Sequence, residues 1–237
     1  MSGDEAVERF DEDLIAELDE PVRRYFTHTI SPGAALTERV LLTMHGRIKV
    51  GRWMDFTAQQ QFNDRHEFEW RARAGWRAFK PLHVVDSYAS GAGGTVGQLL
   101  GRMPFLHAVD ANTARAAAAR SAAESIWVPA ALMPQNEVTW RTEDENTIVA
   151  SFDVPPEHPE LRLVIDERGA VKSVSLERWG NVGQRAFSYI PFGARILAEQ
   201  RFGDYAIPSH VNVGWWYGTP HYEPFFDALV TKYELTL

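Results

Sequence analysis

The sequence predicts an α+β fold in which a mainly antiparallel curved sheet, or a half-open β-barrel, wraps around a short alanine-rich helical segment. From residue 36 onwards, most of the chain alternates apolar and polar side chains with the period of two that is typical of half-buried strands. Around residues 112–127 the composition changes to alanine, which has a high helix propensity. The many strands and their short connections favour an antiparallel sheet with helices on its concave side.

The length and composition are consistent with a single globular domain. The chain has 237 residues, of which 45% are hydrophobic and 24% are charged, and β-rich domains of this size bury a substantial core. We predict one domain over residues 1–237, with N-terminal helices in residues 1–28 and the half-barrel in residues 36–237.

Two short helices are predicted at the N-terminus. Apolar residues recur at helical spacing from Val7 to Leu18, between acidic residues. Asp19 is suited to cap a second helix, in which Pro21 is tolerated in the first turn. The residues expected to face inward from this helix are Val22, Tyr25 and Phe26.

The strands are predicted from alternation and from β-rich composition. They cover residues 36–50, 54–62, 68–72, 82–89, 138–141, 147–154, 161–166, 171–179, 196–205, 211–217 and 232–237. Glycines within residues 91–97 predict a loop or bulge, and residues 167–169 a hairpin turn. Asn112 or Thr113 is expected to cap the inner helix, which runs to Ile126 before Pro129.

Charge and composition argue against several classes of partner. With 24 basic and 32 acidic residues, the net charge of −8 opposes the binding of nucleic acid and of anionic membranes. No run of about 18 apolar residues is present that could span a membrane. The chain has no cysteine, and residues 1–20 are acidic where a signal peptide has a basic start, so we expect a cytoplasmic protein.

The common motifs of cofactor and metal sites are absent. The glycines of residues 91–97 match neither the dinucleotide fingerprint nor a P-loop, and neither Gly-x-Ser-x-Gly nor His-Glu-x-x-His occurs. The His83/Asp86 and His107/Asp110 pairs have odd spacing, which directs their side chains to opposite faces of a strand. We therefore expect no metal and no cofactor. The sequence carries no indication of an oligomeric state.

Aromatic residues are spread over nearly every predicted strand. The chain has 8 tryptophans, which either fill the core between the sheet and the small alanines of the helix or line a pocket there. The leading hypothesis is a cavity that binds a small hydrophobic or acyl-bearing ligand. The residues expected to line it are Trp70, Tyr88, Trp127, Trp140 and Trp179.

Two other functions are compatible with the sequence. Arg120 and Glu124 are four residues apart and can pair along an exposed helix face. If Glu124 faces the sheet instead, the chain could be an enzyme in which Glu124 or Asp86 is the general base, and Arg120 or Arg178 stabilises developing negative charge. A third hypothesis is a protein-interaction module that uses the exposed aromatic residues 215–217.

Several segments resemble a family of bacterial proteins of unknown function. They occur in order from about Pro21 and are Pro21-Val22-Arg23-Arg24-Tyr25, Trp53-Met54-Asp55-Phe56-Thr57-Ala58-Gln59-Gln60, Phe68-Glu69-Trp70, Val85-Asp86-Ser87-Tyr88 and Ala123-Glu124-Ser125-Ile126-Trp127-Val128-Pro129. The resemblance implies relatives without implying a reaction. Residues 200–208 are similar to a strand-turn-strand segment of periplasmic lipoprotein-carrier proteins, which implies a half-barrel that holds acyl chains against helices.

Overall fold

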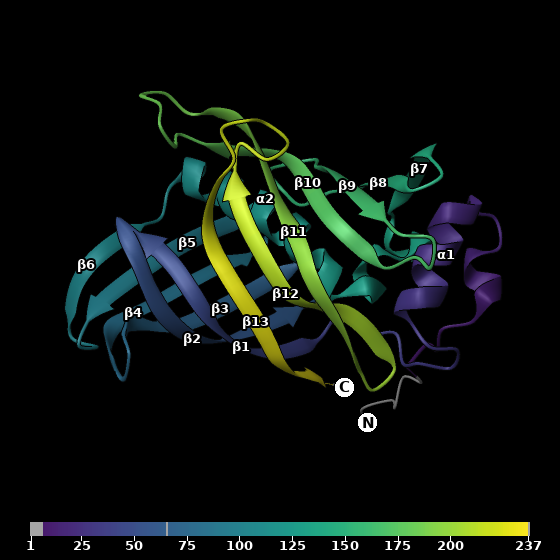
Figure 1. Cartoon of the computed structure of the whole chain (residues 1–237), viewed down its shortest axis with the longest axis horizontal. Coiled ribbons are helices and arrows are strands. Elements are labelled where there is room, and N and C mark those ends of the chain that lie inside the picture. Colours follow the sequence, from purple (N-terminus) through teal and green to yellow (C-terminus); the bar gives the residue numbers. More distant parts are fainter. Residues whose placement is uncertain (1–6, 65, 237) are drawn as a thin grey trace.

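A single open sheet forms most of the molecule (Figure 1). The computed structural model describes residues 7–64 and 66–236, and within these residues 13 antiparallel strands form the sheet. The strands are β1 (Val40–Val50), β2 (Arg52–Asn63), β3 (Glu67–Trp76), β4 (Phe79–Ala89), β5 (Ala92–Leu99), β6 (Met103–Ala108), β7 (Thr139–Asp144), β8 (Thr147–Ser151), β9 (Glu160–Ile165), β10 (Val171–Gly180), β11 (Ser188–Phe202), β12 (Tyr205–Trp215) and β13 (Glu223–Leu235). Residues 1–6 and 237, which belong to the predicted N-terminal helices and last strand, lie outside the described residues.

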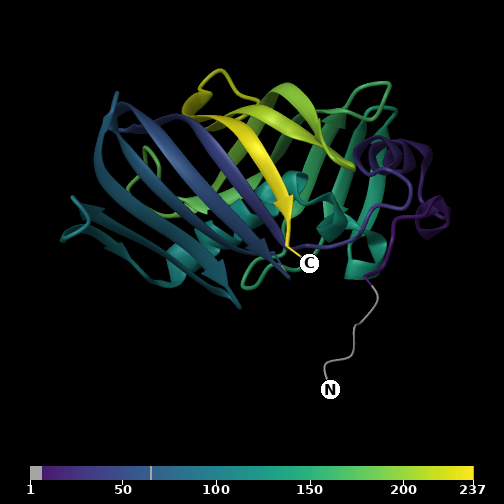
Figure 2. The same ribbon diagram turned by 90° about the horizontal axis from the view of Figure 1, so that it is seen from below.

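The sheet consists of two meanders that meet in the middle. Strands β1 to β6 follow one another on one side, strands β7 to β13 follow one another on the other, and β1 pairs with β13. The edges are therefore β6 and β7, and the chain crosses between them through helix α2 (Ala111–Glu124). Figure 2 shows α2 inside the curve of the sheet, which confirms the predicted fold class.

Helix α2 packs closely on the sheet because its buried residues are small. Its N-cap is Asp110, whose side chain accepts a hydrogen bond from the backbone N–H of Thr113. The prediction of Asn112 or Thr113 as the cap is wrong, because the helix begins at Ala111 and both residues lie within its first turn. The buried side chains are Ala114, Ala117, Ala118, Ala119, Ser121, Ala122 and Ala123.

The glycine-rich residues 91–97 form strand β5 from Ala92 onwards, so a loop over the whole stretch is wrong. The prediction holds in part, because Gly91 lies in the turn before β5 and the pairing of β5 with β6 shifts its register between Gly97 and Gln98. Gly93 faces α2, and a Cβ atom there would lie 2.6 Å from the Cβ of Ala117. Glycine is thus present in a regular strand because the helix leaves no space for a side chain. The sequence reasoning also missed β6, an exposed edge strand that contains Pro104, where proline is tolerated.

The predicted helix from Val7 to Leu18 is wrong. Only Glu12–Ile15 form a single 3-10 turn. The preceding backbone is extended, because the N–H of Phe10 donates to the carbonyl of Ala34 at 2.8 Å, a non-local contact that helical spacing cannot reveal. The second helix is confirmed as α1 (Glu20–Thr29), which starts after Asp19 and packs near β7 and β8.

The C-terminal strands differ from their predicted bounds. The predicted strand over 196–205 crosses a turn at Gly203 and Asp204, where Gly203 has φ +58°, so it joins parts of β11 and β12. The last strand starts at Glu223 rather than at residue 232. The turn over 167–169 is confirmed, and Gly169 there has φ +94°.

Neither α1 nor any other helix within the described residues has the length and apolar character of a membrane-spanning segment.

His66 makes the stability of the fold depend on pH. Its Nδ1 lies 3.1 Å from Oγ of Ser125, its ring stacks on Phe152 at 4.6 Å, and burial lowers its pKa to about 4. Because His66 stays neutral in the folded protein while an unfolded histidine takes up a proton below about pH 6.5, full stability is present above pH 6.5 and is lost as the pH falls towards 4. We expect a loss of about 2 kcal/mol, since part of the ring is exposed.

Urea unfolding at pH 7.5 and pH 4.5 measures this loss. His66→Asn is the matched control, because asparagine tolerates the φ of 62° at this position and does not titrate. The expectation is a smaller pH effect in the variant, and an equal loss in both proteins would contradict the assignment to His66.

Candidate functional site

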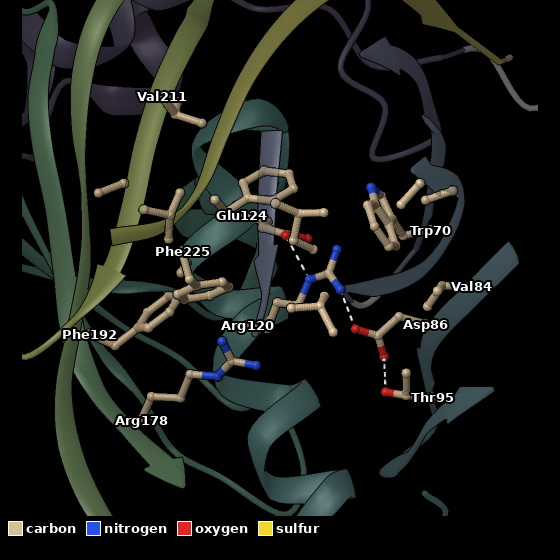
Figure 3. A pocket seen from close by; sticks show the side chains of 18 of the residues that line it. Trp70, Val84, Asp86, Thr95, Arg120, Glu124, Arg178, Phe192, Val211 and Phe225 are labelled. Carbon is tan, nitrogen blue, oxygen red and sulfur yellow. Dashed lines mark hydrogen bonds and ion pairs between the residues drawn. The ribbon is translucent and has the colours of Figure 1, made fainter. Parts of the chain in front are cut away.

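A cavity of about 280 Å³ lies between α2 and the sheet (Figure 3). Strands from both meanders contribute to its walls, and α2 with the turn that follows it forms the floor. The apolar residues that line it are Ile48, Val50, Met54, Trp70, Ala72, Ala74, Leu82, Val84, Phe105, Leu106, Ala123, Ile126, Trp127, Val174, Phe192, Ala194, Val211, Val213, Phe225 and Phe226. The volume is close to the lower end of the range for small-molecule sites, about 300 Å³.

Small and large side chains together define the shape of the cavity. Ala72, Ala74 and Ala194 face it from β3 and β11, and their size leaves space that larger residues would fill. Trp70 and Phe226 form an edge-to-face pair on its wall, with ring centroids 6.3 Å apart. The walls are therefore firmly packed around a space that the alanines leave empty.

One end of the cavity reaches the surface. Val50 and Phe105 both line it, yet they are 56% and 50% exposed. Val50 ends β1, and Phe105 belongs to the edge strand β6. A route for a ligand therefore exists between the end of β1 and the edge of the sheet.

The polar part of the site is centred on Arg120. Its Nε donates to Oε1 of Glu124 at 2.7 Å, and its Nη1 donates to Oδ2 of Asp86. The second oxygens are also occupied: Oγ1 of Thr95 donates to Asp86 at 2.9 Å, and Nε2 of Gln60 donates to Glu124 at 2.5 Å. All four carboxylate oxygens thus accept a hydrogen bond.

Arg120 is held as a cation by its two partners. Burial lowers the pKa of Arg120, but the negative charges of Glu124 and Asp86 oppose this effect and raise the pKa above its usual value. The guanidinium also lies over the rings of Phe68 and Trp70, at 4.7 and 5.3 Å from their centroids. The arrangement is a partly buried ion cluster that connects α2 to β4 and β2.

Arg178 is the second cation of the cavity. It extends from β10 towards α2, where its Nε donates to the backbone carbonyl of Ala116 at 3.0 Å. Burial, with a smaller contribution from the charge of Arg120, lowers the pKa of Arg178 to about 10. The side chain therefore stays charged at neutral pH although its surroundings disfavour the charge.

Six of the residues singled out in the sequence come together here. Asp86, Arg120, Glu124 and Arg178 lie on the cavity together with Trp70 and Trp127, and the indole N–H of Trp127 is bound to the carbonyl of Pro208 at 2.9 Å. Among the described residues, no three histidine or acidic side chains gather as a metal site would require.

Three of the expected lining residues lie elsewhere. Tyr88 is buried outside the cavity and donates its hydroxyl to the carbonyl of Pro155. Trp140 packs on Tyr25 and Phe26 of α1, with centroids 5.8 and 5.6 Å away. Trp179 donates its indole N–H to Asn112 at 2.9 Å and lies beneath the guanidinium of Arg115. Aromatic character alone does not distinguish a pocket wall from core or from helix packing.

The sequence reasoning missed most of the aliphatic and phenylalanine wall. Ala72 and Ala74 share the inward face of β3 with Trp70, because side chains at every second position of a strand point to the same face. The alternation from residue 68 could therefore have identified both alanines. Phe225 and Phe226 are adjacent and both line the cavity, because the pairing of β12 with β13 shifts its register at Phe225, and the sequence does not reveal this shift.

Comparison with known proteins gives a family. No curated protein matches the chain. Among solved structures, the chain is similar to a domain from Vibrio parahaemolyticus assigned to outer membrane lipoprotein sorting, with 6% identity, a TM-score of 0.44 and coverage of 94% of this chain and 91% of that one. This similarity is one of backbone structure alone, at very low sequence identity. The model of a family of unknown function, DUF6544, matches residues 8–228, and the chain therefore belongs to DUF6544.

Proposed function

We propose that the protein binds a small hydrophobic or acyl-bearing molecule in the cavity between α2 and the sheet. The observation that carries the proposal is the cavity itself, with about 280 Å³ of space enclosed mainly by apolar side chains. The exposed apolar residues Val50 and Phe105 at its surface end support access for such a ligand.

The cytoplasmic location expected from the sequence stays a prediction, which cell fractionation tests.

The hydrogen bonds of the Asp86 and Glu124 carboxylates support ligand binding rather than general-base catalysis. A general base needs a carboxylate oxygen that can reach a substrate proton. Each oxygen of Asp86 and Glu124 already accepts a hydrogen bond from a protein donor, and Arg120 holds both groups in place. These carboxylates are better suited to fix the position of α2 than to accept a proton.

The interaction-module hypothesis has less support. Trp215, Trp216 and Tyr217 are half-buried, and Trp215 packs on Phe192 and Phe225. These residues therefore contribute to packing around the cavity instead of forming a large exposed patch.

Calorimetric titration with 1-octanol tests the proposal. Since one water-sized group takes about 30 Å³, a cavity of 280 Å³ holds roughly nine such groups, as many as the non-hydrogen atoms of octanol. Burial of eight carbon groups at about 0.8 kcal/mol each gives roughly 6 kcal/mol, which corresponds to a Kd of tens of micromolar. The expected result is one site per chain with a negative heat-capacity change.

A variant that fills the cavity locates the binding site. Ala194→Phe places a ring in the cavity, and we expect binding of octanol to weaken at least tenfold. Because the ring enters empty space, the loss of stability should stay below the roughly 1–3 kcal/mol of an overpacked core. Ala198→Phe is the matched control on the exposed part of the same strand. Unchanged binding in Ala194→Phe would place the ligand elsewhere and contradict the proposal.

A further inference from the structure

The guanidinium of Arg178 is fixed in the cavity while its two terminal nitrogens stay available. Its Nε is bound to the carbonyl of Ala116, and its Cζ lies 4.6 and 5.0 Å from the ring centroids of Phe192 and Trp215. Within residues 7–64 and 66–236, neither Nη atom of Arg178 hydrogen-bonds another residue. The contacts that orient this side chain thus leave the fork of its two Nη groups free.

Arg120 shows what an arginine of this cavity does when protein groups satisfy it. Its Nε and Nη1 each bind a carboxylate, and the second oxygen of each carboxylate has a further donor. Arg178 has no such partner, although it lines the same cavity. The two arginines therefore differ in that one is paired and the other presents unused donors to the empty space.

A partly buried cation without an anionic partner is unfavourable for the fold. Buried charges in proteins are ordinarily paired, because the surrounding protein replaces the water that would solvate them. The lowered pKa of Arg178, about 10, reflects this burial first and the charge of Arg120 second. An anion in the cavity would supply the missing partner.

We propose that the ligand is an apolar carboxylate, such as a medium-chain carboxylic acid, whose carboxylate group accepts hydrogen bonds from both Nη groups of Arg178. This inference rests on the proposed binding function. The planar fork of a guanidinium matches the two oxygens of a carboxylate. The chain of the ligand lies along Val174, Val211 and Phe226, which line the cavity with Arg178.

An alternative is that Arg178 only balances the charges of Asp86 and Glu124 at a distance. The carboxylates raise the pKa of Arg178, as expected for such a balance, but they do so less than burial lowers it. In that account the free Nη groups have no ligand, and a neutral molecule binds as well as an acid. The two accounts therefore predict different preferences between head groups.

Titration of octanoic acid and 1-octanol at pH 7.5 separates these accounts. Both molecules are unbranched and have the same number of carbon atoms, and only the acid carries a charge at this pH. A charge-assisted hydrogen-bonded pair predicts that octanoate binds at least tenfold more tightly than octanol. If octanol binds as tightly as octanoate, the carboxylate inference is wrong while the proposed binding function stands. If neither molecule binds, both are wrong.

Variants of Arg178 assign the effect to its head group. Arg178→Met keeps an unbranched side chain but removes the guanidinium, and we expect it to weaken binding of octanoate at least tenfold while octanol changes less than threefold. Arg178→Lys restores part of the affinity for octanoate, because it keeps the charge without the planar fork. Arg195→Met, at an exposed position of β11, is the control and leaves both affinities unchanged. Equal weakening of both ligands in Arg178→Met would overturn the inference, and thermal unfolding shows that each variant is folded.

Discussion

Arg120→Met is expected to lower the free energy of unfolding by about 3 kcal/mol, the lower end of the range for removing one partner from a buried ion pair, because these side chains are partly exposed. The substitution leaves the carboxylates of Asp86 and Glu124 in the cavity wall without their shared cation. Methionine keeps an unbranched apolar side chain but loses the guanidinium contact with Phe68 and Trp70, so the loss includes this contact as well as the unpaired charges. Urea unfolding at pH 7.5 measures it.

Two comparisons make this result specific. Arg71→Met removes an exposed ion pair with Glu69 and should cost less than about 1 kcal/mol. Adding Asp86→Asn and Glu124→Gln to Arg120→Met should recover much of the stability, because the triple variant has no unpaired charge. If Arg120→Met lowers the free energy of unfolding by less than about 1 kcal/mol, the ion pairs of Arg120 do not contribute much to holding α2 on the sheet.

Gly93→Val is expected to cost about 3 kcal/mol, the upper part of the range for overpacking. A Cβ atom at Gly93 would lie 2.6 Å from the Cβ of Ala117 and 2.9 Å from the Cα of Ala114. Both atoms belong to α2, so the helix as a whole must move away from β5. Since α2 forms the floor of the cavity, binding of octanol should weaken along with stability.

Gly94→Val is the matched control for this prediction. A Cβ atom at Gly94 would approach only the side chain of Val109, at 3.2 Å, and the carbonyl of Ala108, at 3.7 Å. A side chain can adjust to such a contact, so we expect a change within about 1 kcal/mol. Equal effects of the two substitutions would show that the contact with α2 does not determine the need for glycine at position 93.

The regular, half-buried strands were the part of the fold that the sequence predicted well. From Val40 to Ala72 the alternation of apolar and polar residues survives in β1, β2 and β3, because one face of each strand meets the core. Strands β5 and β6 could not be predicted in this way. Gly93 in β5 is required by the close approach of α2, and β6 is an exposed edge without a buried face, so neither strand has an alternating pattern.

The site was predictable in its local contacts and unpredictable in its non-local ones. The spacing of Arg120 and Glu124 predicts that they can pair on one helix face, and they do. Asp86 joins them because β4 passes beside α2, an arrangement that depends on the order of strands in the sheet. Trp140 and Trp179 could not be distinguished from wall residues, because their partners on α1 and α2 are far away in the sequence.

The most direct test of the central claim is diffraction, at the bromine absorption edge, from crystals soaked with 1-bromooctane. The account predicts an anomalous peak inside the cavity, beside Trp70 and Phe226, in the wild-type protein and no peak there in Ala194→Phe. Bromine bound only at other places, with the cavity empty in the wild-type protein, would contradict the claim that this cavity is a site for apolar ligands.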